Sequence, residues 1–75
     1  MEKYKNLSCN SSIDAFELAD GSITILFDDG WLYQYSSVKA GSANIAQMKL
    51  LAKNGQGLNS YIIKNVRKLY DKKWR

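Results

Sequence analysis

Two short turn signals in the first half of the chain constrain its fold more than any other feature. Asp20-Gly21 and Asp28-Asp29-Gly30 each lie between segments rich in β-branched and aromatic residues. A two-residue Asp-Gly loop of type I′ and a three-residue loop that ends in a left-handed Gly both connect antiparallel strands. The sequence therefore predicts a three-stranded antiparallel meander over residues 13–35.

The loops also set the register: Ala19 should face Ser22, and Phe27 should face Trp31. Because side chains alternate along a strand, one face of the sheet is then apolar, and we expect it to be the core face. Its residues are Phe16, Leu18, Ile23, Ile25, Phe27, Trp31, Tyr33 and Tyr35. The alternative for such an aromatic row is a base-stacking platform, as in RNA-recognition sheets, but a domain this small needs the rings inside.

The opposite face of the predicted sheet is mostly polar. It carries Glu17, Thr24 and Gln34 in one row and an apolar stripe of Ala15, Leu26 and Leu32 in the next. A stripe of this size does not exceed the patches that ordinary monomers expose. We expect the N-terminal segment to cover it, with a second copy of the protein as the alternative.

Helical spacing follows the loop that comes after Tyr35. Apolar residues at three- and four-residue intervals predict a first helix, with Ser42 as its N-cap and Asn54-Gly55 as its end. The buried stripe of this helix is Ile45, Met48, Leu51 and Ala52. A second helix should begin near Asn59, which would cap it, and continue to Tyr70 or beyond. Its buried stripe is expected to be Leu58, Tyr61, Ile62, Val66, Leu69 and Tyr70.

Together these elements predict an α+β fold, a three-stranded antiparallel β-meander followed by two α-helices packed on one face of the sheet. A chain of 75 residues has room for a single domain. We divide it into an N-terminal segment (1–10), a sheet (11–36) and two helices (42–73).

Charge is distributed unevenly along the chain, whose formal net charge is +4. Residues 1–37 carry two lysines against six carboxylates, whereas residues 38–75 carry nine cations against Asp71 alone. On a second helix that continues past Tyr70, the outer side becomes one basic ridge. The ridge consists of Lys64, Arg67, Lys68, Lys72 and Arg75. This asymmetry favours an anionic partner, although a solvated basic face at a helix C-terminus is the alternative that needs no partner.

Cysteine content and the N-terminal residues bear on location. The single cysteine, Cys9, cannot form an internal disulfide, whereas small secreted domains usually rely on several. We expect Cys9 to be a buried or incidental thiol. The first ten residues contain no apolar stretch of signal-peptide length, and no run approaches the ~18–20 apolar residues of a membrane span. The expectation is a cytoplasmic protein that does not associate with membranes.

Groups that catalysis or metal binding requires are scarce. The chain contains no His, so it lacks the usual proton shuttle near neutral pH and the usual base for activating a thiol. Asp28-Asp29 is the nearest approach to a metal site, and turn formation explains this pair better. Gly55-Gln56-Gly57 is a lone Gly-x-Gly, which is typical of a helix stop and restart. We therefore expect a protein that is not an enzyme and needs no cofactor.

Several positions between residues 11 and 70 resemble the KTSC domain family, small domains named for the C-terminus of certain lysyl-tRNA synthetases. The matching features are Ser12-Ile13, the strand from Ile23 to Phe27, Gly30 after its turn, Tyr33-x-Tyr35, Val38, and Leu58-Asn59 with Ile62 after a helix that ends in Gly. Family members usually have a Pro after the Tyr-x-Tyr strand and a Ser before the Gly, whereas this chain has no Pro and has Asn54 before Gly55. The resemblance implies a strand-rich domain that binds nucleic acid and has no settled activity.

The sequence thus favours a small module that binds nucleic acid, RNA more than DNA, through basic side chains that contact phosphates. The candidate residues are Lys49, Lys53, Lys64, Arg67, Lys68 and Lys72. The alternative is a protein-interaction or accessory domain that uses the open sheet face or a free strand edge. The ligand, the oligomeric state and the exposure of Tyr61, Tyr70 and Trp74 are left open.

Overall fold

The computed structural model describes residues 1–7 and 11–75, so Cys9 lies outside the described residues. The strands are β1 (Glu2–Lys3), β2 (Ile13–Ala19), β3 (Ser22–Phe27), β4 (Leu32–Ser36) and β5 (Lys72–Trp74). The helices are α1 (Ser42–Asn54) and α2 (Leu58–Tyr61), and α2 continues directly into a π-helical turn, η1 (Ile62–Val66). The predicted α+β class is confirmed.

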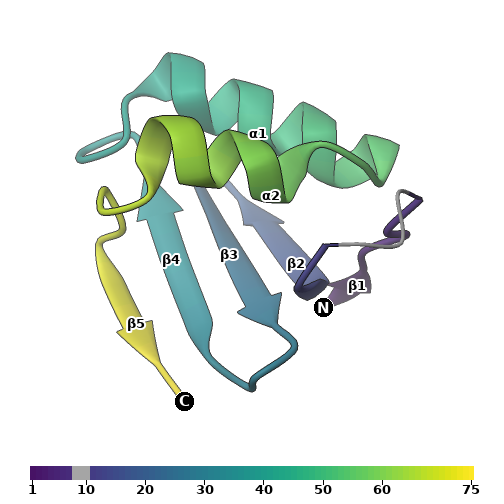
Figure 1. Ribbon diagram of the computed structural model, residues 1–75. Coiled ribbons are helices and arrows are strands. Elements are labelled where there is room, and N and C mark those ends of the chain that lie inside the picture. Colours follow the sequence, from purple (N-terminus) through teal and green to yellow (C-terminus); the bar gives the residue numbers. More distant parts are fainter. Residues whose placement is uncertain (8–10) are drawn as a thin grey trace.

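The strands form one antiparallel sheet in the order β1-β2-β3-β4-β5 (Figure 1). Its centre is the predicted meander in the predicted register, because Phe16 faces Ile25, Ile25 faces Tyr33, and Ala19 faces Ser22. The prediction of only three strands is wrong, since it lacks both edge strands. Each edge strand has only two or three residues, which is too short for alternation to produce a sequence pattern.

Both hairpin loops form where the turn signals predict them. Across the second loop, the Phe27 N–H donates to the Trp31 carbonyl at 2.9 Å, and Gly30 adopts a left-handed φ of 91°. The type I′ assignment of the first loop is wrong. Gly21 has a φ of 68°, but Asp20 is not among the residues with positive φ, and a type I′ turn requires positive φ at both positions.

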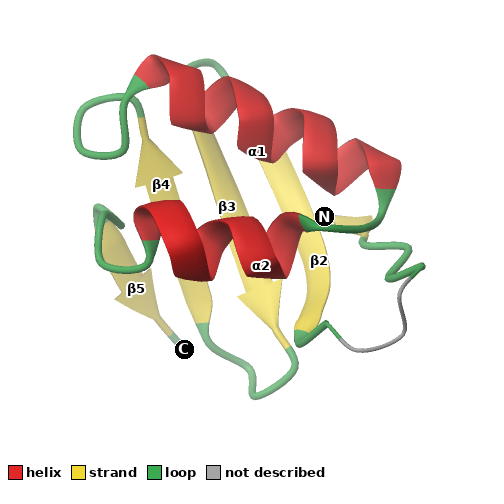
Figure 2. Ribbon diagram, turned by 45° about the horizontal axis from the view of Figure 1, so that its top comes forward, coloured by secondary structure: helices red, strands yellow, loops and turns green. Residues whose placement is uncertain are grey.

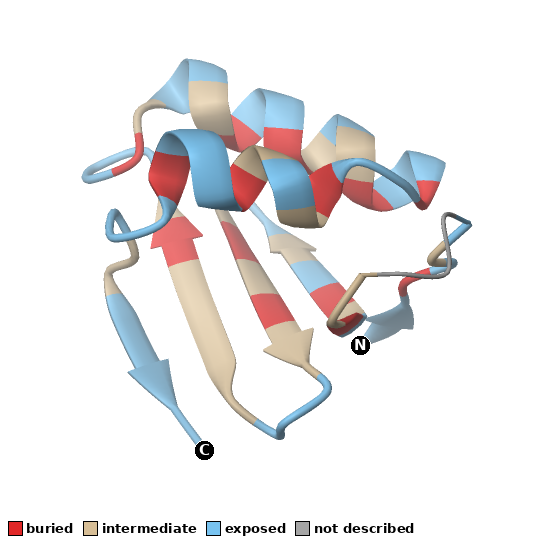
Figure 3. Ribbon diagram, in the orientation of Figure 1, coloured by how far each residue is buried: buried red, intermediate tan, exposed pale blue. Residues whose placement is uncertain are grey.

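The two helical segments lie on one face of the sheet (Figure 2), and buried residues gather between the two layers (Figure 3). On the sheet side, Phe16, Ile23, Ile25 and Tyr35 are each at most 1% exposed. The helices contribute the buried residues Ile45, Met48, Ala52, Leu58, Ile62 and Val66. The apolar face predicted from strand alternation is therefore the face that packs against the helices.

Residues 1–7, the described part of the N-terminal segment, do not cover the open face of the sheet, which corrects the expectation from the sequence. β1 pairs with the edge of β2, and the Tyr4 N–H donates to the Asp14 carbonyl at 2.9 Å. The Tyr4 ring enters the core, where it is 2% exposed, and its hydroxyl accepts a hydrogen bond from the Leu58 N–H at 3.4 Å. The sheet edge offers unpaired backbone groups that the apolar stripe does not, and this favours pairing along the edge.

The second helix is shorter than predicted, because the chain reverses after it. η1 ends at Val66, and the Leu69 N–H donates to the Val66 carbonyl at 2.9 Å. The Asp71 N–H then bonds the Gln34 carbonyl at 2.7 Å, and β5 pairs with β4. The sequence contains no Gly or Pro after Val66 to mark the end of the helix, whereas the unpaired edge of β4 provides partners for an extended segment.

Four smaller expectations concern the helices, three of them their ends and one the burial of Leu69. Gly55 ends α1 in the left-handed conformation, as predicted. Ser42 is not the N-cap, because α1 begins at Ser42 itself and Gly41 precedes it. Asn59 lies within α2 and does not cap it. Leu69 is 38% exposed, so its assignment to the buried stripe is wrong.

Candidate functional site

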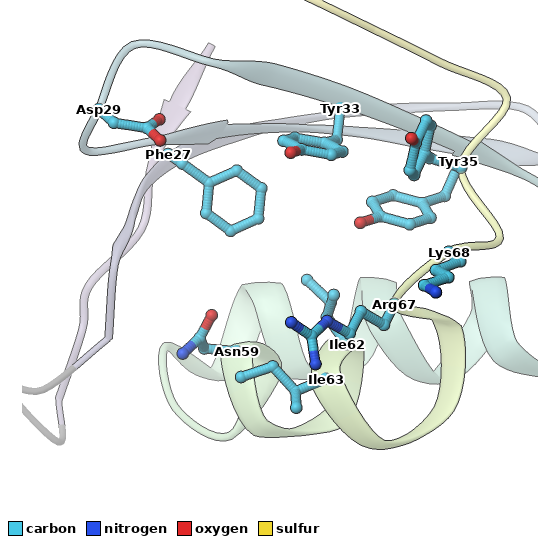
Figure 4. A pocket seen from close by; sticks show the side chains of 10 residues that line it. Phe27, Asp29, Tyr33, Tyr35, Asn59, Ile62, Ile63, Arg67 and Lys68 are labelled. Carbon is cyan, nitrogen blue, oxygen red and sulfur yellow. The ribbon is translucent and has the colours of Figure 1, made fainter.

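A pocket of about 260 Å³ lies between the core face of β3 and β4 and the helix formed by α2 and η1 (Figure 4). Phe27, Tyr33 and Tyr35 form its sheet side because alternate residues of a strand point to the same face. Tyr70, in the segment that leads to β5, lines it as well. The pocket therefore has an aromatic wall made by residues that the sequence assigns to the core.

The aromatic rings of this wall hold one another in place. Tyr33 packs edge-on against Phe27, with centroids 5.1 Å apart and planes at 82°. Tyr70 also packs edge-on against Tyr33, at 5.2 Å and 87°, while Tyr35 stacks at 6.4 Å from Tyr33 with planes at 15°. Aromatic pairs contribute about 0.5–1.5 kcal/mol each beyond their buried area. The wall is therefore preorganised in the free protein.

The Tyr35 hydroxyl is the unusual polar group of the pocket. The residue is 1% exposed, and its hydroxyl points toward the space beside Phe27 (Figure 4). Burial, and then the neighbouring phenol groups of Tyr33 and Tyr70, raise the pKa of Tyr35 above its ordinary value, so the phenol stays protonated. Within the described residues this hydroxyl forms no hydrogen bond. No fully buried side-chain N or O atom among the described residues lacks a partner, so this unpartnered hydroxyl is open to the pocket space and available to a ligand.

The helix side of the pocket combines apolar contacts with polar and cationic groups. Asn59, Ile63 and Arg67 recur at four-residue spacing and line the pocket together, and Lys68 follows Arg67. The Asn59 Oδ1 accepts a hydrogen bond from the Ser12 hydroxyl at 3.4 Å, which leaves its amide N–H groups free for other partners. Arg67 and Lys68 are exposed and form no ion pair with any described residue. Both cations can therefore contact an anion at the pocket mouth.

Next to the pocket, β5 places further cations against aromatic rings. Lys73 pairs with Tyr33 in the sheet, and its Nζ lies 5.5 Å from the Trp31 centroid, 5.8 Å from that of Tyr33 and 5.6 Å from that of Tyr70. The Arg75 Cζ lies 5.4 Å from the Trp31 centroid. Lys73 and Arg75 are exposed, so part of each cationic group faces solvent. The result is a surface on which cations alternate with rings.

Trp31 occupies a different environment from the one predicted. It shares the face of Tyr33, since Lys73 contacts both rings, but it is only half-buried and lies outside the core cluster. Its hairpin lies against the C-terminal residues, because the Arg75 guanidinium donates to the Asp29 carbonyl at 2.9 Å, and Lys73 and Arg75 contact the Trp31 ring. Its assignment to the core is therefore wrong, although its assignment to that face is right.

The cations predicted to form one helical ridge are divided between η1, the segment that follows it, and the C-terminal strand β5 with Arg75 after it. Arg67 and Lys68 line the pocket, and Lys64 is exposed on η1. Lys72 does not extend the helix, because it lies in β5 opposite Gln34, on the other face of the sheet from Lys73. Its Nζ is 5.7 Å from the Trp74 ring.

Lys49 and Lys53 lie on α1, away from the pocket lining. The Lys49 Nζ donates to the Ala19 carbonyl at 2.6 Å, beside the hairpin between β2 and β3, and thereby ties α1 to the sheet. Lys53 is exposed near the end of α1. The structure therefore does not bring these two lysines together with Arg67 and Lys68.

Sequence reasoning omitted Lys73, Arg75 and Asn59 from the site. Arg75 belonged to the predicted basic ridge but was not named as a site residue, and the signal available for Lys73 was the Lys-Lys-Trp-Arg end of the chain, where a ring lies among basic residues. The sequence left open the exposure of three aromatic side chains, which the structure provides. Tyr61 and Tyr70 are half-buried, whereas Trp74 is 40% exposed.

The open face of the sheet carries a second feature, an apolar row. Leu26 faces Leu32, and Leu32 faces Trp74, so the predicted stripe extends across β5. The two leucines are half-buried by their neighbours. This row is separated from the pocket by the thickness of the sheet.

Comparisons with known proteins give no neighbour: no protein family, no curated protein and no solved structure matches this chain. Among the described residues, no three His, Cys, Asp or Glu side chains group together as a metal site. No described helix is long and apolar enough to cross a membrane. The interpretation of function therefore rests on the pocket and on the cationic surface beside it.

Proposed function

We propose that this chain is a small non-enzymatic module that binds single-stranded nucleic acid, with RNA favoured over DNA. The observation that carries this proposal is the alternation of cations and aromatic rings beside the pocket, where Lys73 and Arg75 lie over Trp31, and Arg67 and Lys68 line the pocket mouth. Proteins that bind single strands combine a positive surface for the phosphates with rings on which bases stack.

Single strands fit this surface better than duplexes. Bases reach a stacking ring only when they are unstacked from their neighbours, and each stacked base contributes about 1–3 kcal/mol. The phosphate contacts add affinity without sequence information. We therefore expect weak binding with little sequence preference and strong salt dependence. The resemblance of the sequence to the KTSC family implies nucleic acid as the class of ligand.

The alternative is a protein-interaction or accessory domain that uses the open sheet face or a strand edge. Both edges of the predicted meander are covered, by β1 and by β5, and short strands that carry Lys discourage pairing with another chain. The apolar row around Leu26 and Leu32 is the surface left to it. If Leu26→Thr/Leu32→Thr converts a self-associating parent into a monomer in sedimentation velocity, that alternative gains support.

Binding of a short unstructured RNA at several salt concentrations tests the proposal, with fluorescence anisotropy as the readout. If three to five phosphates are neutralised, log affinity should change against log salt with a slope of roughly −2 to −3.5. The variant Arg67→Gln/Lys68→Gln removes two of the proposed contacts. Its slope should be shallower by about 1.4, because each single-strand phosphate contact contributes about 0.7.

A matched control removes the same charge from the opposite edge of the molecule. Lys3→Gln/Lys53→Gln changes two exposed lysines on β1 and on α1, neither of which lines the pocket. We expect its slope to stay close to that of the parent. Equal slopes for the two double variants would show that attraction comes from net charge alone, and absence of binding at low salt would overturn the proposal.

A further inference from the structure

The pocket itself has three properties that together define a ligand more narrowly than the cationic surface does. The first is the hydroxyl of Tyr35, which is directed into the pocket and has no hydrogen-bond partner within the described residues, although the residue as a whole is only 1% exposed (Figure 4). Because a hydroxyl is both a donor and an acceptor, it favours a ligand with polar atoms on the part that enters the pocket. A purely apolar ligand would leave this group unsatisfied.

The second property is the shape of the pocket. Aromatic rings form one side and Ile62 and Ile63 the other, so the space between sheet and helix is bounded by two apolar surfaces (Figure 4). Its volume of about 260 Å³ is slightly below the usual range of ligand pockets, ~300–1,000 Å³, so the ligand part that enters must be small. One flat ring system with polar edges fits such a space, and Asn59 adds amide donors at its rim.

The third property is the charge at the mouth. Arg67 and Lys68 are cationic and exposed there, and Asp29 is the only carboxylate that lines the pocket. The Asp29 Oδ1 accepts a hydrogen bond from the Trp31 N–H at 3.0 Å, which fixes this carboxylate to the hairpin. Two cations against one carboxylate favour an anionic group on the part of the ligand that remains outside the pocket.

We infer that the pocket receives one nucleobase together with its phosphate: the base lies between the aromatic wall and the helix and contacts the Tyr35 hydroxyl, while Arg67 and Lys68 bind the phosphate. This inference rests on the proposed function and makes it more specific. In this arrangement Trp31 stacks on a base of the nucleic-acid strand, whereas the pocket binds a single base. A nucleoside monophosphate is the smallest ligand that contains both parts.

Calorimetric titration with the four nucleoside monophosphates tests the inference, with the corresponding nucleosides and inorganic phosphate as partial ligands. We expect at least one monophosphate to bind about tenfold or more tightly than inorganic phosphate or its own nucleoside, since both parts contribute. If inorganic phosphate binds as tightly as the best monophosphate, the mouth is an anion site only and the inference is wrong.

Two hydroxyl deletions form a matched pair. Tyr35→Phe removes the unpartnered hydroxyl, so the melting temperature should stay unchanged while monophosphate affinity falls by about three- to tenfold. Tyr61→Phe removes a hydroxyl that donates to the Asn44 Oδ1 at 2.5 Å and does not line the pocket, so it should lower the melting temperature and leave affinity unchanged. Parent-like affinity of a folded Tyr35→Phe would overturn the inference.

The single-stranded RNA assay separates this inference from the proposed function. If RNA binds with the expected salt slope but no monophosphate binds, the pocket is not a base site and the module binds strands through its surface alone. If neither binds, both the inference and the proposed function fail. Binding of both ligands, with RNA competing against the monophosphate, is the result that we expect.

Discussion

Replacement of Trp31 with Ala distinguishes a core ring from a surface ring. As a core residue Trp31 would contribute about 3–5 kcal/mol, which equals the whole net stability of ~3–5 kcal/mol expected for a domain this small. In the structure the ring is half-buried, with Lys73 and Arg75 at 5.5 and 5.4 Å from its centroid. Two exposed cation–π contacts at about 0.5–1 kcal/mol each give about 1–2 kcal/mol, and the covered part of the ring adds to this, but truncation leaves no cavity in the core, so the loss should be smaller than that of a core ring.

Urea titration followed by circular dichroism measures this loss, and Phe16→Ala provides the comparison. Phe16 is 1% exposed, so its truncation should cost about 3–5 kcal/mol and largely unfold the domain. Trp31→Ala should remain folded at low urea and bind RNA more weakly, because one stacked base is lost. If Trp31→Ala unfolds the domain as completely as Phe16→Ala, the placement of Trp31 on the binding surface is refuted.

Two further predictions concern stability. Gly55→Ala should be more destabilising than Gly57→Ala in thermal melts by about 1 kcal/mol or more: both glycines have positive φ, but a Cβ at Gly55 would lie 2.6 Å from the Lys5 Cβ. The stability of the parent should also fall above about pH 10, the pKa of an exposed tyrosine. Burial raises the pKa of Tyr35, so in that range the unfolded chain loses the proton first and is favoured. Tyr35→Phe should reduce this loss, and an unchanged pH profile would contradict the buried environment.

The centre of the fold follows from the sequence because its signals are local. Asp20-Gly21 and Asp28-Asp29-Gly30 set the hairpins, and strand alternation then places Phe16, Ile25 and Tyr35 on one buried face. Gly55 marks the end of α1 for the same reason, since only a left-handed residue continues the chain there.

The edges of the fold and the composition of the site do not follow from local signals. β5 forms because the edge of β4 is available in space, and helical spacing continues through Leu69 and Tyr70 with no residue to interrupt it. That one reversal moves Lys72 off the helix and brings Lys73 to Trp31. Arg67 and Lys68 were identified as candidates by charge, but their position beside an aromatic pocket depends on packing between distant segments.

Backbone amide and indole chemical shifts, recorded while a short unstructured RNA is titrated at low salt, test the central claim most directly. The account predicts that the largest changes fall on the backbone of Arg67 and Lys68, which line the pocket, and on the Trp31 indole and the backbone of Lys73 beside it. Changes centred on α1 around Lys49, or no changes at all, would contradict it.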